Sequence, residues 1–130
     1  MRGDMERKEF ERLVAEAVKA LPGEFLSRLQ NVDIVVENAP TREQLRENRL
    51  PHGHTLLGLY EGVPLTSRGA HYGLVLPDKI TIFQEPIETR CNNPSQIITE
   101  IRDVVRHEIA HHFGMSDARL KQLEKKRRSG

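Results

Sequence analysis

Hydrophobic residues recur along the chain at spacings that predict a helix near each end. Over residues 10–21, apolar side chains stand three and four positions apart until Pro22 interrupts the pattern, which is typical of a helix with one covered face. A second helical pattern begins at Asn93 or Ser95 and continues to Gly114. A short basic helix is expected over residues 117–126.

Between these helices, three short runs have the period of strands. Apolar and acidic residues alternate over residues 32–37, and the runs 55–62 (TLLGLYEG) and 79–83 (KITIF) are bounded by turn-forming residues. Thr41 and Gln44 have capping-box spacing, which predicts a short polar helix over residues 41–49. The pattern therefore predicts a small sheet of three strands, with room for a fourth.

Length and composition restrict the class of protein. The 130 residues suit one domain, spanning residues 1–130, and 37% hydrophobic with 30% charged residues suits a globular fold. Aromatic residues make up only 5%, so we expect a mainly aliphatic core. A net charge of +1 is too small to steer the molecule toward nucleic acid or an anionic membrane. One cysteine, and no apolar stretch of signal-peptide length near either end, predict a cytoplasmic protein.

The segment HEIAHHFGMSD, residues 107–117, carries the candidate chemistry. His107 and His111 are four apart, so on a helix both rings can turn toward one ion, for which zinc is a suitable choice. Glu108 lies about 100° around the axis from His107, where it can accept a proton from a metal-activated water. We expect these histidines to be at least partly buried, because they follow Val104 and Val105 on an apolar helix.

A catalytic zinc usually takes a third protein ligand, and Asp117 is the candidate. On a continued helix Asp117 would lie roughly 9 Å beyond His111 and about 240° around the axis. The chain must therefore turn, and Gly114 can enter the left-handed conformation that ends helices. The alternative is that Gly114 and Asp117 only end one helix and begin the next.

Other polar residues near the motif have weaker predictions. The carboxylate of Asp103 could orient a histidine ring, although a solvated position is favoured, and His112 is expected to pack beside Phe113. His52 and His54 are expected at the surface. Candidates to stabilise an oxyanion are Tyr60, Arg68, His71 and Tyr72.

The motif, as HExxHxxGxxD, resembles the signature of the minimal zincins, a family of small bacterial zincin-like metallopeptidases. The segments 56–68 (LLGLYEGVPLTSR) and 76–88 (LPDKITIFQEPIE) are similar to other stretches typical of that family. The resemblance implies an α+β fold with a small sheet packed against the helix that carries HExxH. It also implies one zinc ion on His107, His111 and Asp117, with Glu108 as the catalytic base.

These observations predict a zinc-dependent metallopeptidase that hydrolyses a peptide or protein substrate bound beside an edge strand, nominated as residues 55–62. Two alternatives come from other classes. The chain could be a metal-stabilised binding module that cuts nothing. A metal-dependent RNA-processing hydrolase is the other, but Glu108 and Asp117 depart from the H-x3-H-x5-H pattern of that class.

Overall fold

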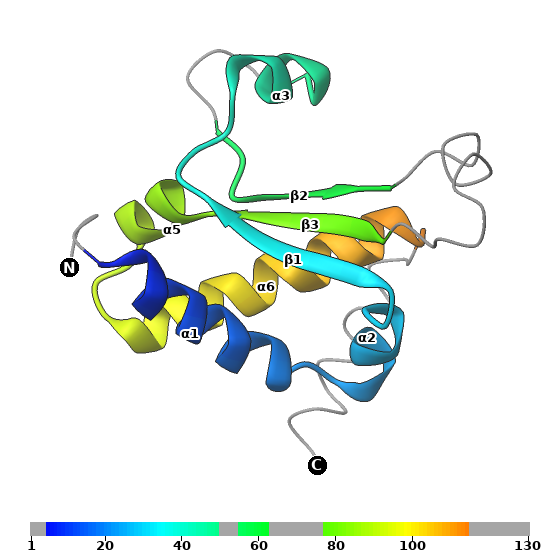
Figure 1. Cartoon of the computed structure of the whole chain (residues 1–130), viewed down its shortest axis with the longest axis horizontal. Helices are drawn as coiled ribbons and strands as arrows, with labels where there is room; N and C mark the ends of the chain where they lie inside the picture. The colour runs from blue at the N-terminus through cyan, green and yellow to red at the C-terminus, as the bar shows by residue number, and fades with distance from the viewer. Residues whose placement is uncertain (1–4, 50–54, 63–76, 115–130) are drawn as a thin grey trace.

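A computed structural model describes residues 5–49, 55–62 and 77–114 of the chain (Figure 1). Its elements, in order, are α1 (Arg7–Lys19), α2 (Gly23–Arg28), β1 (Val32–Glu37), α3 (Arg42–Glu47), β2 (Gly58–Glu61), β3 (Asp78–Phe83), α5 (Gln84–Arg90) and α6 (Pro94–His112). The predicted α+β class is confirmed.

The described strands form one mixed sheet in the order β1-β3-β2. β3 lies in the centre, parallel to β1, with Ile34 opposite Ile80, and antiparallel to β2, with Tyr60 opposite Ile80. The central position explains why β3 is the most buried of the described strands, with both faces buried over its last four residues. β2 is an edge strand of this sheet, as predicted for this part of the chain.

The two long helices pack together, and α6 also contacts β2 and β3 (Figure 1). On α6, Ile97, Ile101, Val105 and Ile109 repeat at four-residue intervals and all are fully buried. Burying each such side chain contributes roughly 1.5–3 kcal/mol, which holds the helix against the sheet. The core is mainly aliphatic, with Phe10 and Phe25 fully buried within it.

The beginning of α6 is fixed by its cap. The side chain of Asn93 accepts a hydrogen bond from the backbone N–H of Gln96 at 2.9 Å, and Pro94 occupies the first turn, where no N–H partner is needed. Of the two predicted starting points, Asn93 is therefore the correct one. The predicted capping box of α3 is also present, between Thr41 and Gln44.

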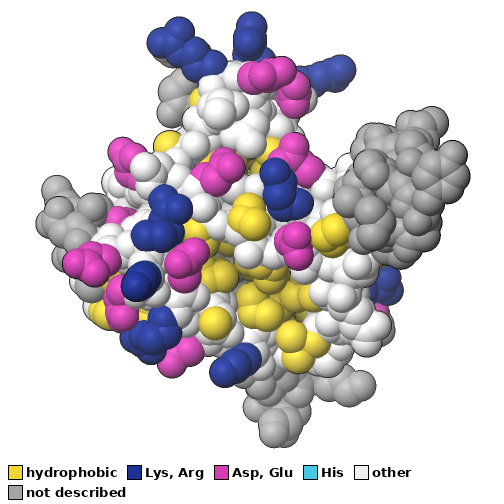
Figure 2. All heavy atoms as spheres, viewed as in Figure 1, with side chains coloured by type: hydrophobic (Ala, Val, Ile, Leu, Met, Phe, Trp, Pro, Cys, Tyr) yellow, Lys and Arg dark blue, Asp and Glu magenta, His cyan; other side chains and the backbone are white. Residues whose placement is uncertain are grey.

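Beside β1, an apolar hollow of about 380 Å³ lies between this strand and α1. Val14, Val18, Ile34 and Val36 line it, and Figure 2 shows hydrophobic side chains exposed on this face among charged ones. The edge of β1 is covered in part by Arg7, whose guanidinium donates to the backbone oxygen of Val36 at 2.9 Å. This contact ties the beginning of α1 to the end of β1.

The pattern did not predict two short helices. α2 follows Pro22, which the sequence indicates only as a stop, and Phe25 is its single buried residue. α5 begins directly where β3 ends, without turn-forming residues, and Pro86 is tolerated because it stands in the first turn. Elements of six or seven residues are too short to show a helical period.

The predicted second strand is also too long, because β2 covers only Gly58–Glu61 of residues 55–62. Several predictions fall outside the described residues. They concern the helix over residues 117–126 and the residues His52, His54, Arg68, His71, Tyr72 and Asp117. Among the residues that are described, no helix has both the length and the apolar character needed to cross a membrane.

Candidate active site

The HExxH segment lies in the last turns of α6. Gly114 has a φ of 68°, so the helix ends in the left-handed conformation predicted for this glycine. Because α6 ends at His112, the geometric objection to Asp117, which assumed a continued helix, does not apply. The position of Asp117 itself is outside the described residues.

His107 and His111 both lie on the exposed side of α6, so the expected burial of these rings is wrong. Only part of the helix surface faces the core, and the apolar positions Val105 and Ile109 occupy it. The two histidines instead share the face that borders the solvent. A metal could reach them there without entering the core.

The ring of His107 has a fixed orientation. Its Nδ1 lies 2.7 Å from the backbone oxygen of Asp103, one turn earlier. A carbonyl oxygen can only accept, so Nδ1 is the donor, and the neutral form of this ring has its lone pair on Nε2. The carboxylate of Asp103, for which a solvated position was favoured, is partly exposed and binds Arg106, so it is not the group that orients the ring.

Glu108 is partly buried, and its carboxylate meets the edge strand. Oε1 accepts a hydrogen bond from the backbone N–H of Tyr60 in β2 at 2.9 Å. Burial raises the pKa of Glu108 above its ordinary value, and the Tyr60 N–H and the two neighbouring histidines offset part of that rise. Neither Tyr60 nor its N–H was assigned this role from the sequence, because a contact between residues 48 apart has no local signal.

A cleft of about 470 Å³ runs between β2 and the end of α6. Glu108, His111 and His112 line it from the helix, and Leu59 and Tyr60 line it from the strand. Asn48 and Leu56 complete the described lining. The candidate base therefore faces a space large enough for part of a small ligand or a peptide.

His112 packs against two aromatic rings. The contact with Phe113 was predicted, and the contact with Tyr60 was not. Its ring stacks on Tyr60 with centroids 3.9 Å apart and meets Phe113 edge-on at 4.9 Å. The hydroxyl of Tyr60 donates to Oδ2 of Asp78 at 2.7 Å. In this conformation the hydroxyl proton is directed at Asp78 and not into the cleft, which argues against Tyr60 as an oxyanion donor.

The donor chemistry of the described residues fits zinc. Two imidazoles on one face of a helix, one of them oriented by a carbonyl oxygen, are typical of zinc sites. The described residues hold no group of three possible ligands, so they account for only these two donors. The third ligand predicted from the sequence is Asp117.

Comparison with known proteins bears on the whole arrangement. A family model described as zincin-like metallopeptidase matches residues 29–127. This span includes all three strands and α6. No curated protein matches the chain.

Proposed function

The chain belongs to the zincin-like metallopeptidase family, and from this premise we propose that it is a zinc-dependent peptidase with Glu108 as the general base. The observation that carries the proposal is the position of Glu108. Its carboxylate lies at the border of the cleft, next to the two histidines and against an edge strand. Acid–base chemistry, metal ligands and a place for an extended substrate thus meet at one point.

In this proposal His107, His111 and Asp117 hold the metal. His107 would bind through Nε2, because Nδ1 is bonded to Asp103. Zinc at these ligands would polarise a substrate carbonyl and make water acidic enough to lose a proton near neutral pH. Asp117 enters the proposal from its spacing, its family resemblance and the left-handed turn at Gly114.

Glu108 would move the proton. Oε1 is held by the N–H of Tyr60, and no hydrogen bond from the described residues reaches Oε2. We therefore assign Oε2 as the oxygen that takes a proton from water and later passes it to the leaving amine. The Tyr60 N–H keeps the carboxylate turned toward the strand, so the acceptor oxygen does not need to be oriented in each turnover.

The substrate would lie along β2. The N–H of Phe83 donates to the oxygen of Leu57, which indicates that the peptide groups of alternate residues from Leu57 point toward β3. Those of Gly58 and Tyr60 then point to the open edge, consistent with the Tyr60–Glu108 bond. An extended peptide can add to such an edge through backbone hydrogen bonds that do not use the Tyr60 N–H, which Glu108 holds. This narrows the nominated segment from residues 55–62 to Gly58–Glu61.

The test combines metal content with turnover. Wild-type protein purified without chelator should contain about one zinc per chain by elemental mass spectrometry, and Asp117→Ala should contain less. On a peptide library read by mass spectrometry, Glu108→Gln should keep its zinc and lose about 10²–10⁴-fold in rate. Glu100→Gln is the matched control, because it removes a carboxylate from the same helix at an ion pair with Arg90.

Four results would contradict the proposal. Equal turnover by Glu108→Gln would remove Glu108 from the role of base. No zinc after reconstitution would remove the metal site. If zinc raises the melting temperature but no peptide in the library is cleaved, the metal-stabilised binding module is favoured. Zinc-dependent cleavage of an RNA panel would favour the RNA-processing alternative.

A further inference from the structure

Three parts of Tyr60, its backbone N–H, its ring and its hydroxyl, each contact a different residue that bears on the site. The backbone N–H binds Oε1 of Glu108, the ring stacks on His112, and the hydroxyl donates to Oδ2 of Asp78. Two of these partners are on α6 and one is on β3. One residue of the edge strand therefore joins the helix to the centre of the sheet.

The two helix contacts lie on the same face of α6. Glu108 and His112 are four residues apart, so their side chains are neighbours along the helix surface. The stacked rings, with centroids 3.9 Å apart and planes 17° from parallel, hold the strand at the height of Glu108. The position of the Tyr60 N–H, and with it the orientation of the Glu108 carboxylate, depends on where this ring sits.

Asp78 holds the hydroxyl end of the Tyr60 ring. Asp78 is the first residue of β3. Because Tyr60 pairs with Ile80, Asp78 is the diagonal neighbour of Tyr60 on the same face of the sheet. The side chain of Asp78 is only 16% exposed, and its Oδ2 lies 2.7 Å from the Tyr60 hydroxyl and 3.9 Å from Nε2 of His112. One carboxylate oxygen thus lies close to both members of the stacked pair.

We propose that Tyr60 and Asp78 are positioning residues for Glu108: Asp78 fixes the Tyr60 ring against His112, and the fixed strand directs the Tyr60 N–H at the carboxylate of the base. This role deepens the proposed peptidase function and rests on it. The contact with the base is made by the Tyr60 backbone N–H, and the Tyr60 hydroxyl and the Asp78 carboxylate act through that contact. Their effect on turnover passes through the orientation of Glu108.

Amide hydrogen exchange of Tyr60, followed by NMR on the full chain at one pH and temperature, tests the positioning directly. The Tyr60 amide points to the open edge, so its protection reports the bond to Glu108, and Glu108→Ala should abolish it. Tyr60→Phe and Asp78→Leu should each accelerate its exchange on the order of tenfold, as expected for loss of about one hydrogen bond. Asp78→Asn keeps an acceptor oxygen and should exchange like the wild type.

The amide of Leu59 is the internal control, because it points toward β3 and not toward Glu108. Unchanged exchange at Tyr60 in both Tyr60→Phe and Asp78→Leu would overturn the proposal. Equal acceleration at Leu59 would also overturn it, because the two residues would then stabilise the sheet as a whole. Tyr60→Phe removes one oxygen and serves as the milder variant should Asp78→Leu fail to fold.

Kinetics on a cleaved peptide provide the second measurement. Tyr60→Phe should lower kcat on the order of tenfold while KM and zinc content stay at their wild-type values, and Asp78→Asn should retain most of the wild-type kcat. A change confined to KM would overturn the positioning role. If wild-type protein cleaves no peptide, the proposed function fails while the exchange experiment still decides whether Tyr60 and Asp78 orient Glu108.

Discussion

Gly58 lies on the edge strand close to Val104 of the active-site helix, and replacing it should disturb both stability and the site. A Cβ atom at this position would lie 2.4 Å from Cγ1 of Val104 and 3.2 Å from the backbone oxygen of Thr81. The first distance is far inside van der Waals contact, and the second involves backbone that cannot turn away. In Gly58→Ala, β2 must therefore move away from α6, or Val104 must change its rotamer.

The magnitude follows from two opposing contributions. Overpacking of this kind typically costs about 1–3 kcal/mol, and replacing a strand glycine returns roughly 0.5–1 kcal/mol through the unfolded chain. We expect a net loss of about 1–2 kcal/mol, or roughly 3–10 °C in Tm for a protein of this size. Urea denaturation followed by circular dichroism measures the loss, and the exchange rate of the Tyr60 amide reports the displacement of the strand.

A matched control and a double variant make this prediction specific. A Cβ at Gly62 would meet its nearest described neighbour, Cε1 of His112, at 3.4 Å, so Gly62→Ala should change stability by less than about 0.5 kcal/mol. Val104→Ala removes the contacted methyl group, so Gly58→Ala combined with Val104→Ala should be less damaging than the sum by about 1 kcal/mol. Strict additivity, or an unchanged Gly58→Ala protein, would refute the steric reasoning.

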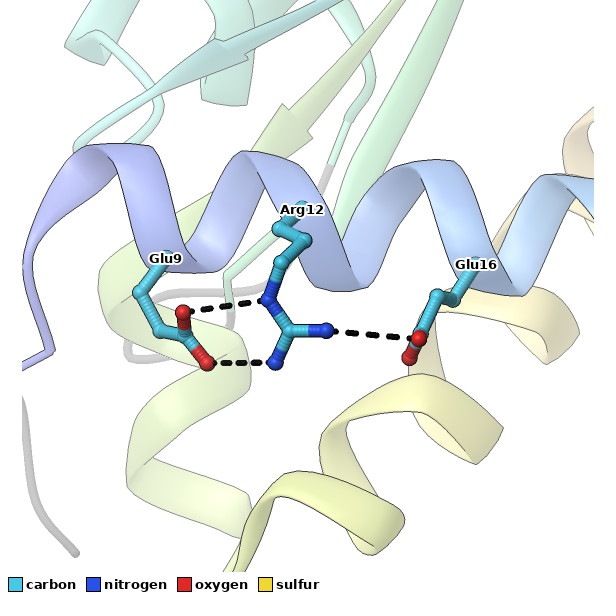
Figure 3. A network of polar contacts seen from close by, with 3 residues as sticks. All are labelled: Glu9, Arg12 and Glu16. Carbon is cyan, nitrogen blue, oxygen red and sulfur yellow. Dashed lines mark hydrogen bonds and ion pairs between the residues drawn. The ribbon is translucent and has the colours of Figure 1, made fainter.

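Two further changes test the helices that support the site. Asn93→Ala removes the side-chain cap of α6 and should lower the free energy of unfolding, measured by urea denaturation, by about 1 kcal/mol. Asn93→Ser should restore most of this loss. Equal stability of the wild type and both variants would show that the cap does not stabilise the helix. On α1, Arg12 binds the exposed carboxylates of Glu9 and Glu16 (Figure 3), and its hydrogen bond lowers the pKa of Glu9. A carboxylate whose pKa is lower in the folded than in the unfolded protein stabilises the fold at pH values above its unfolded pKa, and this stabilisation is lost as the pH falls through the folded pKa. The small Tm deficit of Arg12→Ala at pH 7 should therefore disappear on acidification. A deficit that persists near pH 2 would contradict this reasoning.

The parts of the fold predicted correctly from sequence are those with a strong local signal. α1 and α6 bury one face each at helical spacing, the alternation over residues 32–37 gives β1, and Thr41 with Gln44 forms the predicted capping box. Gly114 has the predicted left-handed φ. In each case a few neighbouring residues contain the whole signal, so tertiary contacts are not needed to interpret it.

The incorrect predictions concern features that only tertiary packing decides. The histidines of α6 were expected to be buried because the helix is apolar, but the sheet and α1 cover a different part of its surface. For Asp103 a solvated carboxylate was favoured, and the sequence did not suggest that its carbonyl oxygen orients His107. Sequence spacing identifies which residues are neighbours on a helix and does not identify the atoms that meet.

The location of the cleft itself follows from the order of two residues on β2. Gly58 and Tyr60 point to the same face of the strand, toward α6. At Gly58 the absence of a side chain lets the strand come close to Val104, whereas two residues further the Tyr60 ring stacks on His112. The strand and helix are therefore in direct contact near Val104 and separated by aromatic rings near His112, and the cleft lies toward the latter, where Glu108 is found. The positions of Gly58 and Tyr60, two residues apart on the edge strand, thus determine where space remains beside the helix. This explains why Glu108 faces a cleft although the strand packs tightly against Val104, one helical turn earlier.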